Sequence, residues 1–376
     1  MTSDLDQDHL HRLLTAQPAA TLPLGTAPLV LYGAGRKGRV TLRLLREAGY
    51  HVAAMIDATA SGACEGVPIL RLNDPGVASL ADDGATAIVT IFNPAVDPLP
   101  VHHALLASGF RRVVGAVELC QLVSGTDAYW LATADAMTPS ADAAEWLFDK
   151  LSDEKSRKTL VEAVGLRRTY CPTRLREPTT HDQYSPADVP LPRSRVRLID
   201  GGAFEGDTVA HLTAAGFQCD AIAAFEPDLV NYAALGRCVA AAPPCKDISL
   251  WPCGLDRSTR QLRFRADGLA SSGIVDSGDV VIQTVSLDEA LPWFAPTYVK
   301  LDIEGAEEAA LHGMAKTLRS CRPALAVCVY HKPADLWELP QLVDELLPDS
   351  RFYLRSHAWN GFDLVLYALP HETGKS

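Results

Sequence analysis

The densest group of residues that could bind a cofactor lies at positions 196–207, which read VRLIDGGAFEGD. An apolar strand here runs into Asp200, and three glycines follow within six residues. A glycine-rich turn between a strand and a helix leaves main-chain N–H groups uncovered, so a polar cofactor can approach the backbone closely. The next apolar run ends at Glu226, where a doubly wound fold presents an acid to a ribose diol. The spacing predicts a site for an adenosine-containing cofactor.

Two later strands are expected to end in residues that could do proton chemistry. Asp302 lies near the end of the strand expected over 297–303, Glu304 follows that strand, and His331 follows the strand expected over 323–330. Ligands of open sheets bind beyond the carboxyl ends of the strands. His331 is the first candidate for a general base because its ordinary pKa lies near working pH, and Asp302 is the second, as base or as orienter. A histidine that only caps the next helix is the alternative, and His357 is a weaker candidate.

The same two acids raise the question of a metal ion. Asp302 and Glu304 lie two residues apart, so in a regular strand they would share a face and could hold a divalent cation. The turn at Gly305 follows at once, and Lys300 lies on the same face as Asp302. A lysine there would pair with the acid and compete with a cation. The sequence therefore predicts a salt bridge in the site and no metal.

These motifs resemble those of known enzymes. Residues 200–206 and 226–228, DGGAFEG and EPD, are similar to the first two motifs of the class I methyltransferases that use S-adenosylmethionine. Residues 300–307, KLDIEGAE, with 311–313 and 322–323, resemble the signature of the FkbM family of methyltransferases. With Ser286-Leu287-Asp288 before it, the resemblance extends over roughly residues 180–370, and its motifs occur in the right order.

The resemblance implies S-adenosyl-L-methionine as cofactor and specific residues for its binding. Asp200 and the adjacent backbone would hold the methionine end, Glu226 would bind the ribose hydroxyls, and Asp302 and Glu304 would face the transferred methyl group. The implied cofactor-binding residues are Asp200, Gly201, Gly202, Ala203, Phe204, Gly206, Asp207, Glu226, Pro227 and Asp302, and the catalytic ones are His331, Asp302 and Glu304. The implied acceptor is a hydroxyl of a small or sugar-containing metabolite of secondary metabolism. The sequence does not identify that acceptor or exclude a carboxylate or nitrogen.

A second glycine turn occurs near the N-terminus. The strand at 29–32 runs into Gly33-Ala34-Gly35-Arg36-Lys37-Gly38, a G-x-G-x-x-G pattern, and Asp57 lies 19 residues after its last glycine. A dinucleotide site is one interpretation, with Arg36 and Lys37 suited to a phosphate. The unit resembles the N-terminal domains of sugar-modifying acyltransferases, which bind a nucleotide sugar. Glycines that only permit a tight turn and close packing are the other interpretation. A nicotinamide-dependent oxidoreductase and a nucleotide-sugar-binding protein therefore remain alternatives.

The predicted fold is α/β, with a doubly wound methyltransferase sheet, mostly parallel with a C-terminal antiparallel hairpin, after a smaller Rossmann-like α/β domain. Four segments are expected: a helical appendage at 1–25, the accessory domain at 26–125, a helical linker or lid at 126–190, and the methyltransferase domain at 191–376. The segment His181-Asp182-Gln183-Tyr184, in the proline-rich part of the linker, is a candidate cover for the cofactor, and an ordinary surface linker is the interpretation that the sequence favours. In the last segment, strands are expected at 196–200, 221–226, 247–252, 261–265, 281–285, 297–303 and 323–330, helices at 206–215, 228–239, 286–291, 306–319 and 334–347, and the hairpin at 351–368.

Bulk properties set outer limits. The 376 residues, 48% of them apolar, describe a chain of two or three globular domains. A net charge of −12 argues against nucleic acid and anionic membrane as partners. The acidic start and the lack of an 18-residue apolar run predict a cytoplasmic location. Nine cysteines occur without a C-x-x-C pair, so neither zinc nor a disulfide framework is indicated. The oligomeric state is left open.

Overall fold

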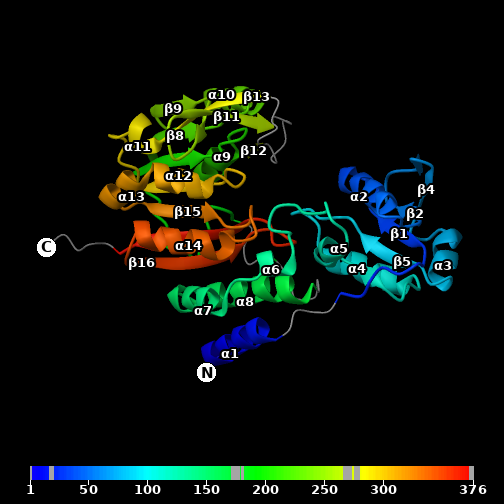
Figure 1. Cartoon of the computed structure of the whole chain (residues 1–376). Coiled ribbons are helices and arrows are strands. Elements are labelled where there is room, and N and C mark those ends of the chain that lie inside the picture. The colour runs from blue at the N-terminus through cyan, green and yellow to red at the C-terminus, as the bar shows by residue number, and fades with distance from the viewer. Residues whose placement is uncertain are drawn as a thin grey trace. The chain divides into compact units, whose positions relative to one another are not determined.

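The computed structural model forms two compact units (Figure 1). It describes residues 2–16, 21–170, 178, 182–265, 273–274 and 280–371. Unit 1 comprises Met1–Glu145, Arg157–Thr179 and Ala358–Asp363, and unit 2 comprises Trp146–Ser156, Thr180–His357 and Leu364–Ser376. This division differs from the four sequence segments, because residues 126–190 are shared between the units and residues 358–363 return to unit 1. His181 and Cys171 lie outside the described residues.

Unit 1 contains a six-stranded sheet with the order β3-β4-β2-β1-β5-β6, in which only β3 runs antiparallel to its neighbour. Its strands are β1 (Leu29–Tyr32), β2 (Val52–Ile56), β3 (Gly62–Cys64), β4 (Val67–Leu70), β5 (Thr86–Val89) and β6 (Val113–Val114). Its helices are α1 (Thr2–Thr15), α2 (Arg36–Glu47), α3 (Pro75–Asp82), α4 (Pro98–Ala107), α5 (Ala116–Leu122) and α6 (Ala134–Met137). Helices α7 (Ala141–Lys150) and α8 (Glu154–Thr169) each cross from one unit to the other.

Alternating residues of β1 explain why this sheet is covered on both faces. Leu29 and Leu31 pack into a core with residues of α2 and α5, whereas Val30 packs into a second core with residues of α3 and α4. Successive side chains of a strand point to opposite faces, so a strand that is apolar throughout is buried on both sides. The Rossmann-like prediction for this region is confirmed at the level of the fold.

Unit 2 contains a seven-stranded sheet with the order β16-β17-β15-β14-β7-β8-β9. The five strands from β15 to β9 are parallel, and β17 and β16 form the predicted antiparallel hairpin. The strands are β7 (Val196–Gly201), β8 (Cys219–Phe225), β9 (Asp247–Trp251), β14 (Tyr298–Leu301), β15 (Ala324–Cys328), β16 (Ser350–Ser356) and β17 (Leu364–Pro370). The helices are α9 (Asp207–Ala214), α10 (Leu229–Ala241), α11 (Leu287–Ala290), α12 (Glu307–Gly313), α13 (Ala315–Cys321) and α14 (Asp335–Leu346). The predicted α/β fold, with a mostly parallel sheet and a C-terminal antiparallel hairpin, is confirmed.

Two details of unit 2 differ from the prediction. The strands expected at 261–265 and 281–285 do not join the main sheet but belong to a separate sheet with the order β10-β13-β11-β12. Its strands are β10 (Gly254–Leu255), β11 (Arg260–Arg265), β12 (Gly273–Ile274) and β13 (Val280–Val285). The helix expected over 306–319 is two helices, α12 and α13, which meet at Met314. Gly313 is packed so tightly there that a Cβ would lie 2.0 Å from the carbonyl oxygen of Asp256.

The start of α8 is fastened to the hairpin of unit 2. The guanidinium of Arg355 on β16 is fully buried and lies 2.6 Å from the Asp153 carboxylate, which also accepts a hydrogen bond from the amide of Ser156. Ser152 donates its amide to the carbonyl of Phe352, so this segment covers the edge of β16. The predicted helix start at residues 152–154 is therefore part of a folded unit. None of the helices described is both long enough and apolar enough to span a bilayer.

Candidate active site

The glycine turn after β7 passes directly against the backbone that follows β14. Gly202 has a φ of +78°, and a Cβ at this position would lie 1.9 Å from the carbonyl oxygen of Asp302. Only glycine permits both that dihedral angle and that approach. Because Gly202 has no side chain, the predicted cofactor turn can contact the backbone of Asp302, the predicted catalytic acid.

The amides of this turn are used inside the protein. Gly202 and Ala203 both donate to the carbonyl oxygen of Phe225, at 3.1 and 3.0 Å, and Phe204 donates to the carboxylate of Glu226 at 2.9 Å. The expectation that the turn leaves these N–H groups uncovered is wrong for these three residues. The parallel strand β8 ends beside the turn and supplies acceptors for them, which the sequence pattern does not reveal.

Glu226 and Asp228, at the end of β8, retain acceptor capacity. The Oε1 atom of Glu226 accepts the amide of Asp228 at 2.8 Å, and burial raises the pKa of the Glu226 carboxyl. A carboxylate oxygen can accept more than one hydrogen bond, so each oxygen of Glu226 has room for a further donor. The Oδ2 atom of Asp228 is buried and has no hydrogen-bond partner in the part of the chain that the structure describes. These atoms lie where the sequence predicts a diol-binding acid.

Asp200 and Lys300 form a buried ion pair. The two residues are direct neighbours in the register of β7 and β14, and the Lys300 ammonium lies 3.1 Å from the Asp200 carboxylate. The ammonium also donates to the carbonyl oxygens of Gly201 and Gly202, at 3.2 and 2.5 Å. The carboxylate of Asp200 keeps the pKa of Lys300 above its usual range, against the effect of burial. Asp200 therefore shapes the turn through Lys300 and is not exposed for contact with a cofactor.

This pair overturns the expected salt bridge between Lys300 and Asp302. Lys300 lies two residues from Asp302 in sequence, but Asp200 is its neighbour across the sheet, and cross-strand neighbours on one face are closest. Asp302 has other partners. Its Oδ1 atom lies 3.2 Å from Nε2 of His331, and its Oδ2 atom accepts a hydrogen bond from the hydroxyl of Tyr184 at 2.6 Å.

The three predicted catalytic residues lie together at the ends of β14 and β15. Nε2 of His331 lies 3.2 Å from Asp302 and 3.8 Å from Oε1 of Glu304. The side chains of Asp302 and Glu304 are 24% and 20% exposed, whereas that of His331 is 2% exposed. Glu304 has a left-handed φ of +55°, and Gly305 continues the turn at +95°. The two acids are therefore partly exposed, whereas the histidine between them is buried.

The opposite side of the His331 ring faces a buried acid that the sequence analysis gave no role. Nδ1 of His331 lies 2.9 Å from Oε1 of Glu307, which also accepts the amide of Ile303 at 2.9 Å. Burial lowers the pKa of His331, but Glu307 and Asp302 outweigh it and raise the pKa well above the usual range. Asp335 is also close to His331 and Glu307. An imidazole held between carboxylates in this way orients them, and both of its nitrogens face acidic side chains.

Tyr184 belongs to the site through a hydrogen bond to Asp302 that the sequence did not predict. Its hydroxyl reaches Asp302, its amide donates to the hydroxyl of Tyr367 at 3.0 Å, and its carbonyl accepts from the hydroxyl of Tyr298 at 2.7 Å. Burial and the nearby charge of Asp302 raise the pKa of Tyr184. Tyr184 therefore belongs to the packed interior of unit 2. The only sequence signal was a tyrosine shortly before β7.

The other residues that the sequence suggested for the site lie outside the cluster of Asp302, Glu304 and His331. Gly206 caps α9 with a φ of +94°, and a Cβ there would lie 3.1 Å from the sulfur of Cys238. Asp207 begins α9 and is exposed, and Pro227 is half-buried. His357 is buried, with Nε2 2.8 Å from the hydroxyl of Tyr367.

The first glycine turn, in unit 1, is packed in a different manner. A Cβ at Gly38 would lie 1.9 Å from the carbonyl oxygen of Gly33, so these glycines let α2 approach β1. Asp57, the predicted ribose acid, accepts hydrogen bonds from the amides of Ala34, Thr59 and Ala60 at 2.8, 2.9 and 2.8 Å. Burial alone would raise the pKa of Asp57, but these hydrogen bonds lower it to about 2. The geometry favours the packing interpretation of this turn.

Lys37 is also turned inward. Its ammonium lies 4.5 Å from the centre of the Phe92 ring and has no hydrogen-bond partner among the residues described. Burial lowers its pKa to about 8. Of the two residues that the sequence suggested for a phosphate contact at the start of α2, Arg36 is exposed and Lys37 is turned inward.

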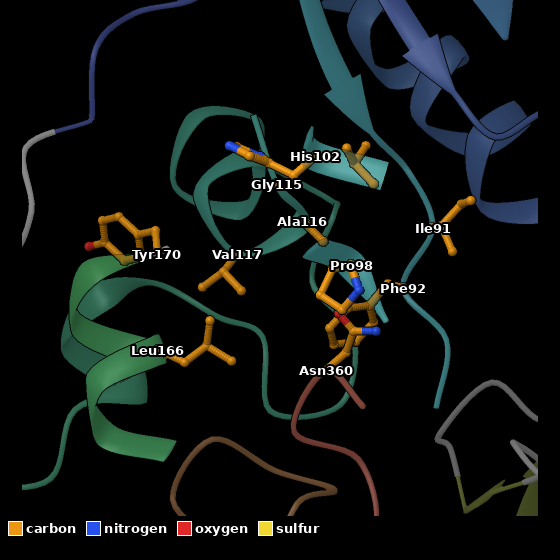
Figure 2. A pocket seen from close by; sticks show the side chains of 11 residues that line it. Ile91, Phe92, Pro98, His102, Gly115, Ala116, Val117, Leu166, Tyr170 and Asn360 are labelled. Carbon is orange, nitrogen blue, oxygen red and sulfur yellow. The ribbon is translucent and has the colours of Figure 1, made fainter. Parts of the chain in front are cut away.

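Unit 1 contains a pocket at the carboxyl ends of β5 and β6 (Figure 2). The pocket has a volume of about 440 Å³, including space open to solvent. Phe92, His102, Leu166 and Tyr170 are among its lining residues, and Asn360 comes from the segment that returns late in the chain. Burial and the neighbouring His103 lower the pKa of His102, which favours the neutral ring. The lining favours an apolar ligand over a phosphate.

Comparisons with known proteins agree with the geometry of unit 2. Residues 200–357 match the model of the methyltransferase FkbM domain. The chain is also similar to the crystal structure of methyltransferase FkbM from Methylobacillus flagellatus KT, with a TM-score of 0.75 and 20% identity, covering 98% of this chain and 97% of that chain. At this identity the likeness shows the fold. No curated protein matches the chain. The match spans both the glycine turn and the acid cluster, so residues 200–357 form a methyltransferase FkbM domain.

Proposed function

We propose that unit 2 transfers a methyl group from S-adenosylmethionine to a hydroxyl oxygen of a small or sugar-containing metabolite. The observation that carries this proposal is the contact between the glycine turn and the acid cluster. Gly202 lies against the backbone of Asp302, and the side chains of Asp302 and Glu304 are partly exposed there. A turn suited to a cofactor and a cluster suited to a hydroxyl acceptor are thus adjacent.

The residues at the end of β8 fit S-adenosylmethionine. Glu226 has acceptor capacity beyond its two backbone hydrogen bonds, and the buried Oδ2 atom of Asp228 lacks a hydrogen-bond partner among the described residues. Hydroxyl groups of a ribose would satisfy these acceptors, which are costly to leave unpaired. The bound cofactor would supply a methyl carbon on a sulfonium, which becomes a neutral thioether when the acceptor oxygen gains the methyl group and loses its proton.

We assign different roles in the reaction to Glu304, Asp302 and His331. Glu304, open to solvent, would take the acceptor proton, and Asp302 would align the hydroxyl through a hydrogen bond. His331 is too buried to reach an acceptor and would position the two carboxylates. This proposal replaces His331 as the base, the role the sequence suggested, because its side chain is 2% exposed and lies between Asp302 and Glu307.

The alternatives based on the first glycine turn are not favoured. The oxygens of Asp57 hold the loop around Ala34 and Thr59, and the ammonium of Lys37 is buried over Phe92. A nicotinamide cofactor or a nucleotide sugar would have to displace these contacts.

The test is a calorimetric titration of the full chain with S-adenosylhomocysteine. We expect saturable binding that Glu226→Gln weakens about 10- to 100-fold, as the loss of hydrogen bonds to a charged group predicts. Asp57→Asn, the equivalent change at the end of β2 in unit 1, is the matched control and should leave this affinity unchanged. Separate titrations with NADH and a UDP-sugar examine the alternatives. Binding of either one without S-adenosylhomocysteine binding would overturn the proposal.

A further inference from the structure

The Asp302, Glu304 and His331 side chains form a set of potential metal ligands. One carboxylate oxygen from each acid and Nε2 of the histidine all lie within 4.8 Å of one another. Nε2 is 3.2 Å from the Asp302 oxygen and 3.8 Å from the Glu304 oxygen. Neighbouring ligands on an octahedral cation with bonds of 2.0–2.1 Å are about 3 Å apart. Shifts of less than about 1 Å in these side chains would complete one face of such a site.

The partners behind these ligands are those expected of a metal site. A histidine that binds a metal through one nitrogen usually donates its other N–H to a carboxylate, which fixes the ring. Glu307, which is 1% exposed, occupies that position on Nδ1 at 2.9 Å. The hydroxyl of Tyr184 binds Oδ2 of Asp302, which leaves Oδ1 facing His331 and Glu304. His331 and Asp302 are thus each oriented by a residue outside the ligand set.

The competing cation that the sequence suggested is engaged elsewhere. Lys300 was expected to pair with Asp302, but its ammonium is held by Asp200 and by the carbonyls of Gly201 and Gly202. The physical reason for predicting no metal therefore does not hold in the folded protein.

A second possible set, formed by Glu307, His331 and Asp335, is less suitable. All three residues are buried, and Asp335 already accepts the amide of Lys332 at 2.7 Å. The first set instead has two acids whose side chains are 24% and 20% exposed, so water or an acceptor can reach a cation there.

We propose that Asp302, Glu304 and His331 bind a divalent cation of the Mg²⁺ or Mn²⁺ class. Two carboxylates and one imidazole suit Mn²⁺ in particular, since carboxylates favour Mg²⁺ and Mn²⁺ and imidazole favours transition metals. An acceptor hydroxyl would occupy an open position on the cation, which stabilises the alkoxide. The hydroxyl proton would pass to the oxygen of Glu304 that does not bind the cation. This catalytic role rests on the proposed methyl transfer, whereas binding of the cation does not.

The test uses Mn²⁺ and the purified full chain after treatment with a chelator. Loss of the electron paramagnetic resonance signal of free Mn²⁺ measures binding. We expect one Mn²⁺ per chain, and at least tenfold weaker binding in Glu304→Gln and in His331→Gln. Glu308→Gln is the matched control, because Glu308 is 55% exposed in the first turn of α12 and lies outside the ligand set. The affinity of this variant for Mn²⁺ should stay within twofold of the wild type.

S-Adenosylhomocysteine titrations of the same samples separate the possible failures. Variants that still bind S-adenosylhomocysteine are folded, and Glu304→Gln covers the case in which the buried His331→Gln does not fold. Failure of the wild type to bind millimolar Mn²⁺, or equal affinity in both ligand variants and the wild type, would overturn the cation site. If S-adenosylhomocysteine still binds in that case, the proposed function stands. Mn²⁺ binding without S-adenosylhomocysteine binding would support the cation site and overturn the proposed function.

Discussion

The two glycine turns of this chain share a local pattern but differ in the acceptors that remain beside them. In unit 1, Asp57 accepts three backbone amides, and Gly38 serves the contact between α2 and β1. In unit 2, Glu226 accepts two amides, and Asp228 beside it has an unpaired buried oxygen among the described residues. A strand that is followed by a glycine turn and a helix therefore indicates close packing of the backbone. Whether the turn can bind a ligand depends on the hydrogen-bond acceptors that remain unused at the end of the next strand.

The same contrast appears in two buried lysines. Lys300 in unit 2 is paired with a carboxylate and two carbonyls, whereas Lys37 in unit 1 has an aromatic face as its neighbour and no hydrogen-bond partner among the residues described. Burial is costly for an ammonium unless hydrogen bonds and an opposite charge compensate for it. One lysine thus stabilises its turn, and the other lowers the stability of its unit.

The largest expected effect comes from replacing these lysines by methionine. Lys300→Met leaves Asp200 as an uncompensated buried charge and should lower the free energy of unfolding by about 3–5 kcal/mol. Lys37→Met removes a buried ammonium without hydrogen bonds among the residues described and should raise the free energy of unfolding at pH 7 by on the order of 2 kcal/mol. Urea unfolding of the full chain measures both. Equal losses in the two variants would show that the two lysines are not energetically different.

A smaller effect is expected at the glycines. Gly202→Ala forces a Cβ onto the carbonyl oxygen of Asp302 at a positive φ and should cost about 3 kcal/mol. It should also abolish S-adenosylhomocysteine binding. Gly35→Ser is the control from the other turn, because no atom lies within 4 Å of a Cβ there and serine is a good N-cap. Thermal melting and calorimetry measure the two effects, and a Gly202→Ala protein with wild-type stability and affinity would contradict the close contact.

The smallest expected effect is a pH dependence due to Lys37. Its pKa is about 8 in the folded chain and near 10.5 when exposed, so between these values the unfolded chain binds more protons. Stability therefore rises with pH in this window, by on the order of 2 kcal/mol between pH 7 and pH 10. The penalty is complete below pH 8. The measured quantity is the difference in unfolding free energy between Lys37→Met and the wild type, which should shrink as the pH rises. A constant difference would place the ammonium in contact with water.

Local sequence patterns predicted most elements of the fold. The strands ending at Asp200, Glu226 and Asp302 were placed within a few residues, because apolar runs that end in acids and glycines mark the carboxyl edge of a parallel sheet. The gathering of Asp302, Glu304 and His331 follows from the same rule. These predictions need only the order of strands and the edge at which their ends meet.

Contacts that depend on register or on distant parts of the chain could not be predicted. Lys300 pairs with Asp200 because β14 and β7 are aligned at these residues, a relation that sequence spacing does not contain. Tyr184 reaches Asp302 across 118 positions. Glu307 appeared within a motif, but its place behind His331 depends on the packing of α12 beside the end of β15.

The return of residues 358–363 to unit 1 has a consequence for how the protein is made. Asn360 donates to the carbonyls of Asn93 and Val96, and Gly361 packs against Trp130. Domains generally fold as units, N-terminal first, during synthesis at the ribosome. Here the first unit lacks its last segment until residue 363 has been translated, after most of unit 2. Neither unit can therefore be obtained intact by cutting the gene at a single point.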